Sequence, residues 1–238
     1  MSLKVIGGEF RGRNLQSVKG VGTRPLLGQV REALFNILGE WVEGKEVWDL
    51  FAGTGASGIE ALSRGAARVH FVEKGNQALR VLRENLGLFE PEVRARCHVY
   101  RTDAWEPHPL TAEGEETEVR PDLIFLDPPY KAVTEDPTRS AYRCQQLLAR
   151  MAPGGVICFH FLDGNLDRDD FDASLNVEIR RWGKSAVALL EVPASGEAGD
   201  AKAEESLVTD TAYDADEDDP NPAPEIASDA SFEAGEAT

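Results

Sequence analysis

The chain has 238 residues, of which 42% are apolar, and it carries a formal net charge of −17. A chain of this length can bury one sizeable core with a small extension, and no apolar run approaches the roughly 20 residues of a membrane span, so a membrane-spanning protein is excluded. Evenly spread acidity would also argue against a nucleic-acid partner, but the charge is not evenly spread.

The acidic residues are concentrated at one end of the chain. Residues 194–238 contain 14 acidic residues and one lysine, a net charge of −13, whereas residues 1–31 contain six basic residues and one acidic residue. The C-terminal stretch is rich in Ala, Gly, Pro, Asp and Glu, a composition typical of disorder. We therefore predict a basic N-terminal hairpin arm at 1–25, a folded domain at 26–193 and a disordered acidic tail at 194–238.

The cysteine and histidine patterns predict neither disulfides nor a metal site. Cys97, Cys144 and Cys158 are widely spaced, no Cys-x-x-Cys occurs, and the four histidines show no ligand spacing. We interpret these histidines as ordinary structural residues. The start of the chain lacks the apolar stretch of a signal peptide, so we expect a cytoplasmic protein.

The chain begins with short β-prone runs separated by glycines over residues 3–15, which predict a small hairpin bearing arginines. Glycines among arginines let the backbone approach phosphate groups closely. A solvated basic turn is the alternative interpretation. Residues 30–41 then show apolar side chains at helical spacing, which predicts a helix packed on a sheet. The candidate nucleic-acid contacts of this region are Arg11, Arg13, Lys19 and Arg24.

A predicted strand at residues 46–51 leads into a glycine loop, Gly53-x-Gly55-x-x-Gly58, and then into a helix at 59–64. This arrangement is the dinucleotide-binding fingerprint in its usual context and by itself indicates a nicotinamide or flavin enzyme. Asp49, at the end of the same strand, argues otherwise. Its carboxylate would repel a pyrophosphate but attract a ligand with an ammonium and a sulfonium group, such as S-adenosylmethionine.

Two further predicted strands also end in acidic residues. The strand at 68–72 ends in Glu73, which can accept hydrogen bonds from both ribose hydroxyls. It is followed by a predicted helix at 76–89. The strand at 97–100 leads to Asp103, which suits an adenine amino group. The predicted cofactor-binding residues are Asp49, Ala52, Gly53, Gly55, Glu73, Asp103 and Ala104.

The apolar run at residues 123–126 is broken by Asp127-Pro128-Pro129-Tyr130 and predicts a buried parallel strand. Ligands bind at the carboxyl ends of such strands in open α/β sheets. The prolines are expected to keep the following residues out of a helix and to fix the direction of the Pro128 carbonyl. A carboxylate, a rigid carbonyl and an aromatic ring suit the exocyclic amine of a flat base. A simple Pro-Pro turn is the alternative.

The rest of the folded part continues the alternation of strands and helices. A helix is predicted at 139–151, a strand at 156–159, and a hairpin of two strands at 177–182 and 185–190. Five alternating β/α units followed by an antiparallel pair predict an α/β fold, with a Rossmann-like, seven-stranded, mostly parallel sheet covered by helices.

In this combination the motifs resemble the bacterial small-subunit (16S) ribosomal RNA guanine-N2 methyltransferases. They occur in the family order over residues 3 to about 192 and include the basic hairpin that other Asp-Pro-Pro-Tyr enzymes lack. Leu26 departs from the family pattern, which usually has threonine or serine there. The matching segments are 6–8, 11–13, 23–25, 30–38, 49–55, 58–66, 71–73 and 127–130.

This resemblance implies methyl transfer from S-adenosylmethionine to the 2-amino group of a guanine in 16S rRNA. It implies that Asp127 and the Pro128 carbonyl hold the amine and that Tyr130 stacks on the base. The expected substrate is an assembled or partly assembled small ribosomal subunit, and we expect a monomer that uses no metal. The acidic tail is interpreted as solubilising or as a competitor of RNA for the basic arm.

Three alternatives remain open from the sequence. A DNA adenine-N6 methyltransferase uses the same tetrapeptide chemistry, and a dehydrogenase shares the glycine loop. A non-catalytic RNA-binding module would keep the basic arm but would have no need of residues 127–130.

Overall fold

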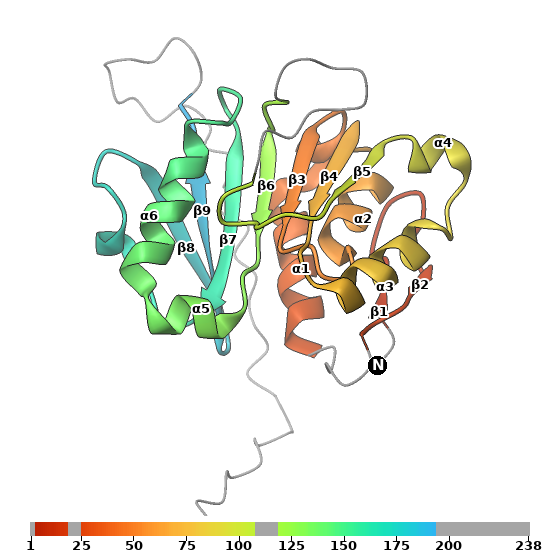
Figure 1. Cartoon of the computed structure of the whole chain (residues 1–238). Coiled ribbons are helices and arrows are strands. Elements are labelled where there is room, and N and C mark those ends of the chain that lie inside the picture. Colours follow the sequence, from red (N-terminus) through yellow and green to blue (C-terminus); the bar gives the residue numbers. More distant parts are fainter. Residues whose placement is uncertain (1–2, 19–24, 108–118, 194–238) are drawn as a thin grey trace, which may run out of the picture. The chain divides into compact units, whose positions relative to one another are not determined.

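The structure, a computed structural model, describes residues 3–18, 25–107 and 119–193 and contains one large sheet (Figure 1). The sheet has seven strands in the order β5-β4-β3-β6-β7-β9-β8. All neighbours pair in parallel except β9, which is antiparallel to both β7 and β8. This confirms the predicted seven-stranded, mostly parallel sheet. The strands are β3 (Glu46–Leu50), β4 (Arg68–Val72), β5 (Cys97–Tyr100), β6 (Leu123–Leu126), β7 (Val156–Leu162), β8 (Asn176–Trp182) and β9 (Ser185–Glu191).

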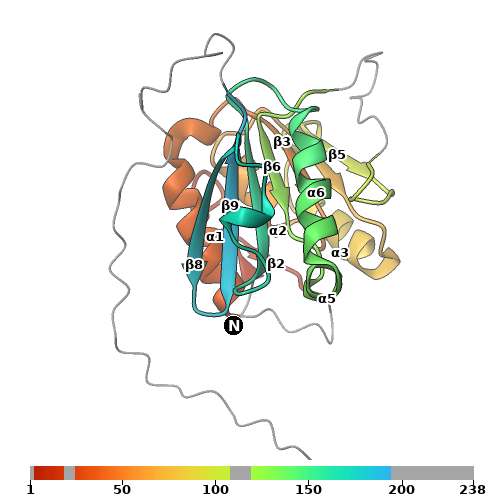
Figure 2. The same cartoon turned by 90° about the vertical axis from the view of Figure 1, so that its left-hand side faces the viewer.

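Helices cover both faces of this sheet. On β3, Val47 packs with α1, α2 and α3 on one face, and its neighbour Trp48 packs with α5 and α6 on the other. This alternation is the normal consequence of strand geometry. Figure 2 shows α1 and α6 on opposite sides of the sheet. The helices are α1 (Pro25–Leu38), α2 (Ala56–Ser63), α3 (Asn76–Leu86), α4 (Pro91–Arg94), α5 (Tyr130–Glu135) and α6 (Pro137–Leu148), with 3₁₀ turns η1 (Gly39–Val42) and η2 (Arg168–Asp170).

The register places the carboxyl ends of β3, β4, β5 and β6 at one level, which β7 also crosses before it ends at Leu162. Leu50 pairs with Val72 on one side and with Leu126 on the other. Tyr100 pairs with Val72, and Phe159 pairs with Leu126. The next residue of each strand therefore belongs to one row across this edge of the sheet. In sheet order the row is Arg101, Glu73, Phe51, Asp127 and His160.

The predicted N-terminal hairpin is present as β1 (Leu3–Lys4) and β2 (Asn14–Leu15). It is tied to α2 by Glu60, whose fully buried carboxylate accepts hydrogen bonds from the backbone N–H groups of Ile6 at 2.7 Å and Gly7 at 2.8 Å. Because two N–H groups depend on one buried carboxylate, the hairpin is docked firmly on the domain.

Several predicted helix boundaries were wrong. The prolines were expected to keep the segment after β6 out of a helix, but α5 begins at Tyr130 because Pro129 occupies the N-cap position, where a missing N–H costs nothing. The next helix, α6, begins at Pro137, two residues before the predicted start, because Asp136 caps it by accepting from the Arg139 N–H at 3.0 Å.

No helix in the described part of the chain is long and apolar enough to cross a membrane.

Candidate active site

The glycine loop after β3 is held to the end of β4 by Glu73. One carboxylate oxygen accepts from the Gly53 N–H at 2.9 Å and the other from the Gly75 N–H at 2.6 Å. Gly53 has a φ of 56°, and a Cβ built there would meet nothing nearer than the Phe51 carbonyl at 3.9 Å. The Cβ direction of Gly53 is therefore open, as the close approach of a ligand to this loop requires.

The other two glycines of the fingerprint serve packing. A Cβ on Gly55 would lie 2.4 Å from the Leu82 side chain, and a Cβ on Gly58 would lie 2.4 Å from the Phe71 ring. These glycines let the loop and α2 lie directly against α3 and β4. The structure gives Gly55 this packing role, and its contact with the cofactor stays a prediction.

Asp49 lies under the loop and is almost completely buried. Its carboxylate accepts from the Gly58 N–H at 2.9 Å. Burial raises the pKa of Asp49 to about 8; the Gly58 N–H works against this rise, and the carboxylates of Asp127 and Glu73 add to it. A positively charged ligand near Asp49 would favour its ionised form, so this carboxylate fits the ammonium end of S-adenosylmethionine.

Asp103 follows β5 and is half-exposed, with a carboxylate that accepts from the Trp105 N–H at 2.9 Å and from Lys74 Nζ at 3.0 Å. Partial burial acts to raise the pKa of Asp103, but the Trp105 N–H and the Lys74 ammonium outweigh it and hold this pKa below its usual range. Ala104 is buried beside it, and the Ala52 N–H donates to the Val72 carbonyl at 3.0 Å. Ala52 follows β3, and Asp103 and Ala104 follow β5, so these residues flank Glu73 at the carboxyl edge of the sheet.

At the end of β6, the side chain of Asp127 is 46% exposed and is held by His160 of β7. His160 Nδ1 lies 2.8 Å from Asp127 Oδ1, and its Nε2 lies 3.5 Å from the Tyr130 hydroxyl. The rings of Tyr130 and His160 meet edge to face at 5.5 Å. Because an ionised Asp127 only accepts, we assign the proton of a neutral His160 to Nδ1. Pro128 is buried and Pro129 exposed.

The interpretation of the histidines as ordinary structural residues did not anticipate the contacts of His160. It is 5% exposed and bridges two residues of the predicted catalytic set. It lies 33 positions beyond Asp127 in the sequence, and only the parallel pairing of β6 with β7 brings the two together. Neither residue type nor spacing signalled this contact, because it depends on the register of two separate strands.

The predicted nucleic-acid contacts of the N-terminal arm fall into three groups. Arg11 is exposed. Arg13 donates to the Leu88 carbonyl at 2.6 Å and stacks over the Phe89 ring at 4.7 Å, so it fixes the hairpin to the segment after α3. Lys19 and Arg24 lie outside the described residues, as do the side chain of Leu26 and the acidic tail. Among the described residues, no cluster of His, Cys, Asp and Glu side chains could hold a metal ion.

The family described as Conserved hypothetical protein 95 matches residues 3–189. The chain belongs to this family. A curated relative named Putative rRNA methyltransferase YlbH, from Bacillus subtilis, is 43% identical over 129 residues, which cover 54% of this chain and 67% of the relative. Ribosomal RNA small subunit methyltransferase D of Escherichia coli is 32% identical over 133 residues, 54% of this chain and 61% of its own length. The alignments therefore span about two thirds or less of these relatives.

Solved structures of similar fold agree with the family. A putative methyltransferase, yhhF from Escherichia coli, superposes with a TM-score of 0.63 at 25% identity and covers 82% of this chain and 99% of its own. A Thermus thermophilus 16S rRNA N2 G1207 methyltransferase, solved with AdoMet and guanosine, gives a TM-score of 0.59 at 21% identity over 81% of this chain and 50% of its own. At that identity the second likeness concerns the fold alone.

The predicted family and enzyme class are confirmed. This member of the family is a methyltransferase, and its fold is that of S-adenosylmethionine-dependent enzymes of this class. The dehydrogenase and the non-catalytic RNA-binding module are thereby set aside. The acids at the carboxyl ends of β3, β4 and β6 are the natural candidates for the chemistry, because ligands of such sheets bind at that edge.

Proposed function

We propose that this chain transfers a methyl group to the exocyclic 2-amino group of a guanine in 16S rRNA. The observation that carries the proposal is the position of Asp127. Its carboxylate is exposed at the carboxyl edge, oriented by His160, and placed one strand from the glycine loop of β3. The names of the relatives support rRNA as the substrate class, and the Asp-Pro-Pro-Tyr tetrapeptide supports an amine attached to a base.

The cofactor would lie along the edge formed by β3, β4 and β5. Glu73 would accept the ribose hydroxyls, Asp49 would face the ammonium end, and Asp103 with Ala104 would flank the adenine. Gly53 leaves room for this approach because its Cβ position is open. When bound, S-adenosylmethionine supplies a methyl group carried on a positively charged sulfur.

The target amine would be held by two acceptors from this chain. Asp127 Oδ2 and the Pro128 carbonyl would accept its two hydrogens, while Oδ1 stays bound to His160. Accepting both hydrogens favours a tetrahedral nitrogen, which frees a lone pair that is otherwise conjugated into the ring. The nitrogen becomes positive as the methyl arrives, so the carboxylate of Asp127 stabilises the transition state electrostatically. The surplus proton can then leave to Asp127 or to water.

Tyr130 would provide a stacking surface for the flipped base. Flipping costs a few kcal/mol, and stacking on an aromatic ring returns about 1 to 3 kcal/mol. Edge-to-face contact with His160 fixes the Tyr130 ring beside Asp127. The role of His160 is therefore positioning: it orients both the acceptor and the stacking ring.

We further propose that the substrate is the small-subunit RNA in an assembled or partly assembled particle, and that the chain acts as a monomer. The exposed Arg11 of the hairpin would contact phosphates, together with Lys19 and Arg24, which lie outside the described residues. Arg13 would contribute indirectly by fixing the hairpin.

The test is methyl transfer from labelled S-adenosylmethionine to 16S rRNA, free and in 30S particles from a strain without the enzyme. Nucleoside mass spectrometry of the product is expected to show N2-methylguanosine at one position. Label recovered as N6-methyladenosine in a DNA control, with none in rRNA, would overturn the proposal in favour of a DNA enzyme.

A further inference from the structure

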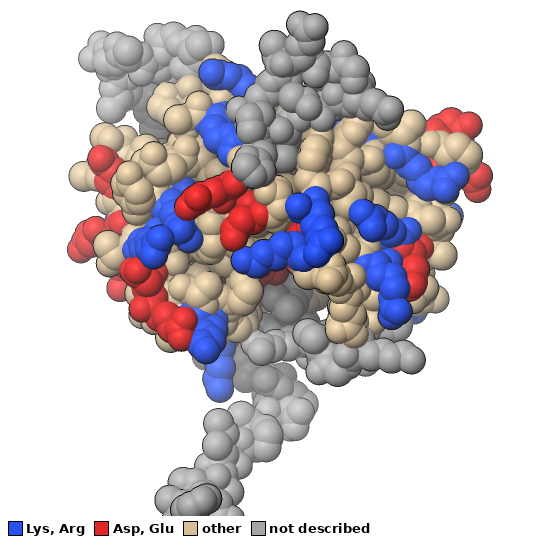
Figure 3. Space-filling model, in the orientation of Figure 1, with Lys and Arg blue, Asp and Glu red and all other residues tan. Residues whose placement is uncertain are grey.

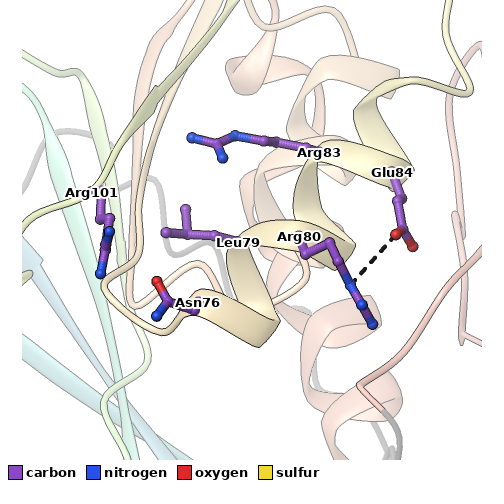
Figure 4. Close-up of a pocket in the computed structure, with 6 residues that line it drawn as sticks. All are labelled: Asn76, Leu79, Arg80, Arg83, Glu84 and Arg101. Atoms are coloured by element: carbon purple, nitrogen blue, oxygen red, sulfur yellow. Dashed lines mark ion pairs between the residues drawn. The ribbon is translucent and has the colours of Figure 1, made fainter.

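A hollow of about 440 Å³ lies between α3 and the end of β5, and none of the residues predicted to bind the cofactor lines it (Figure 4). The α3 residues of its wall recur with each helical turn, at 76, at 79 and 80, and at 83 and 84, so they lie along one side of the helix. Arg101 closes the opposite side, directly after β5. The lining consists of Asn76, Leu79, Arg80, Arg83, Glu84 and Arg101.

The charge of this hollow is strongly positive for a chain with a net charge of −17. Three of its six residues are arginines, and its one acid, Glu84, lies 3.6 Å from Arg80. Within the described part of the chain, neither Arg83 nor Arg101 pairs with a carboxylate. Figure 4 shows both guanidinium groups on the Leu79 side of the helix, whereas Arg80 turns away toward Glu84.

Two arginines that face one open space without a carboxylate repel each other until an anion arrives. Guanidinium groups offer planar pairs of donors that match the oxygens of a phosphate, and such charge-assisted hydrogen bonds are stronger than neutral ones. Asn76 adds an uncharged polar group to the same wall. The chemistry of the hollow therefore fits a phosphate group.

The register relates this hollow to the proposed reaction site. Arg101 and Asp127 belong to the same row, separated by β4 and β3. With strands about 4.8 Å apart, three steps across the sheet correspond to roughly 14 Å. An RNA strand that presents a guanine to Asp127 can span that distance within a few nucleotides. In the view of Figure 3, Lys and Arg side chains lie over the half of the molecule with β5 and α3 and also over the half with α5 and α6.

We propose that Arg83 and Arg101 bind a backbone phosphate of the substrate RNA, a few nucleotides from the target guanine. This inference rests on the proposed function, because it takes RNA to be the substrate. The site differs from the N-terminal arm, whose Arg11, Arg13, Lys19 and Arg24 were the phosphate contacts suggested by the sequence. The site lies beside α3 and the end of β5. The RNA strand would therefore be held on one side of the cofactor, and Tyr130 would lie on the other side.

The experiment compares Arg83→Gln, Arg101→Gln and the double variant with Arg94→Gln. Arg94 is an exposed residue of α4, which precedes β5 and so lies toward the opposite edge of the sheet. Binding of a 16S rRNA fragment to S-adenosylhomocysteine-loaded enzyme is measured from about 0.05 to 0.3 M salt. Each single variant is expected to weaken binding several-fold at low salt, and the double variant is expected to reduce the salt slope by about 0.7, the value for one lost phosphate contact. Arg94→Gln is expected to leave the slope at the wild-type value.

Two results would overturn the inference. In the first, the hollow variants and Arg94→Gln share the wild-type slope and affinity for RNA. In the second, calorimetry shows that the hollow variants lose S-adenosylhomocysteine affinity, which would make the hollow a wall of the cofactor site. If the variants change RNA binding as expected but the wild-type enzyme transfers no methyl group, the proposed function would be contradicted and the phosphate site would remain supported.

Discussion

On the β4 side of the sheet, Glu73 is held by two backbone N–H groups, whereas on the β7 side Asp127 is held by one side chain, the imidazole of His160. Gly75 is two residues from Glu73, and Gly53 belongs to the glycine loop after the neighbouring strand β3, 20 residues away, so both donors are fixed by the path of the backbone. The imidazole comes from a separate strand. A carboxylate held by the backbone is fixed whenever the loop folds, whereas one held by a side chain can be misoriented by a single substitution.

The largest loss of activity is expected when Asp127, the carboxylate held by a side chain, is removed. Asp127→Ala should lower the methyl-transfer rate constant by roughly a hundredfold or more, because the acceptor that stabilises the positive nitrogen is lost. Affinity for S-adenosylmethionine should stay within a few-fold of wild type, since Asp127 is not among the residues proposed to bind the cofactor. Single-turnover kinetics at saturating RNA measure the first quantity and calorimetry the second. An unchanged rate constant would remove Asp127 from the mechanism.

Glu73→Ala, which removes the carboxylate held by the backbone, should act on cofactor binding. Loss of the ribose acceptor and of the tie between the Gly53 and Gly75 N–H groups should weaken cofactor binding by about ten- to a hundredfold. RNA affinity should change little. Glu92→Ala, at an exposed position on α4, is the control for loss of one negative charge. Weaker RNA binding with normal cofactor affinity would contradict this assignment.

The positioning role of His160 predicts a smaller, conditional effect. His160→Leu should lower the rate constant about tenfold, which corresponds to about 1.4 kcal/mol and is close to the value of a hydrogen bond to a charged group. His160→Asn should recover part of the loss, because an amide can still donate to Asp127. Melting temperatures of both variants are measured alongside.

A double-mutant cycle distinguishes positioning from a general structural effect. His160→Leu introduced into Asp127→Ala enzyme should cause little further loss, since the group it orients is already absent. An equal tenfold loss in both backgrounds would show that His160 acts independently of Asp127.

Asp49 predicts an effect that depends on pH, because burial raises its pKa to about 8. An aspartate in the unfolded chain has a pKa of about 4. Between that pH and about 8 only the folded protein holds the proton of Asp49, so the free energy of unfolding falls as the pH rises through this range. Asp49→Asn removes this dependence. The melting temperature of the variant minus that of the wild type, both without cofactor, should therefore increase from pH 6 to pH 9.

Cofactor binding should change with pH in the opposite sense. Wild-type affinity for S-adenosylmethionine should rise up to about pH 8 as Asp49 becomes ionised, relative to the Asn variant. Parallel pH profiles for the two proteins, measured by calorimetry, would show that Asp49 does not face the charged end of the cofactor.

The sequence alone was sufficient for the parts of the fold that depend on neighbouring residues. The strands β4, β5 and β6 have the predicted bounds, because each is a short β-prone run followed at once by a polar segment that ends it: Glu, Arg-Thr-Asp or Asp-Pro-Pro. The family resemblance and the acids at the strand ends followed from the same local patterns. Where local signals were misread, as at Asp136-Pro137, the helix boundaries were misplaced.

Only the tertiary structure decided which partner each functional group has. Asp127 and His160 are 33 residues apart in sequence, the Ile6 N–H and Glu60 are 54 apart, and Arg13 and the Leu88 carbonyl are 75 apart. Each contact depends on strand register or on helix packing, which no local pattern encodes. The sequence therefore determined which residues reach the carboxyl edge of the sheet, and the packing of β7, α2 and α3 determined how they are held there, because hydrogen bonds form between groups that the whole fold brings within 3 Å or so.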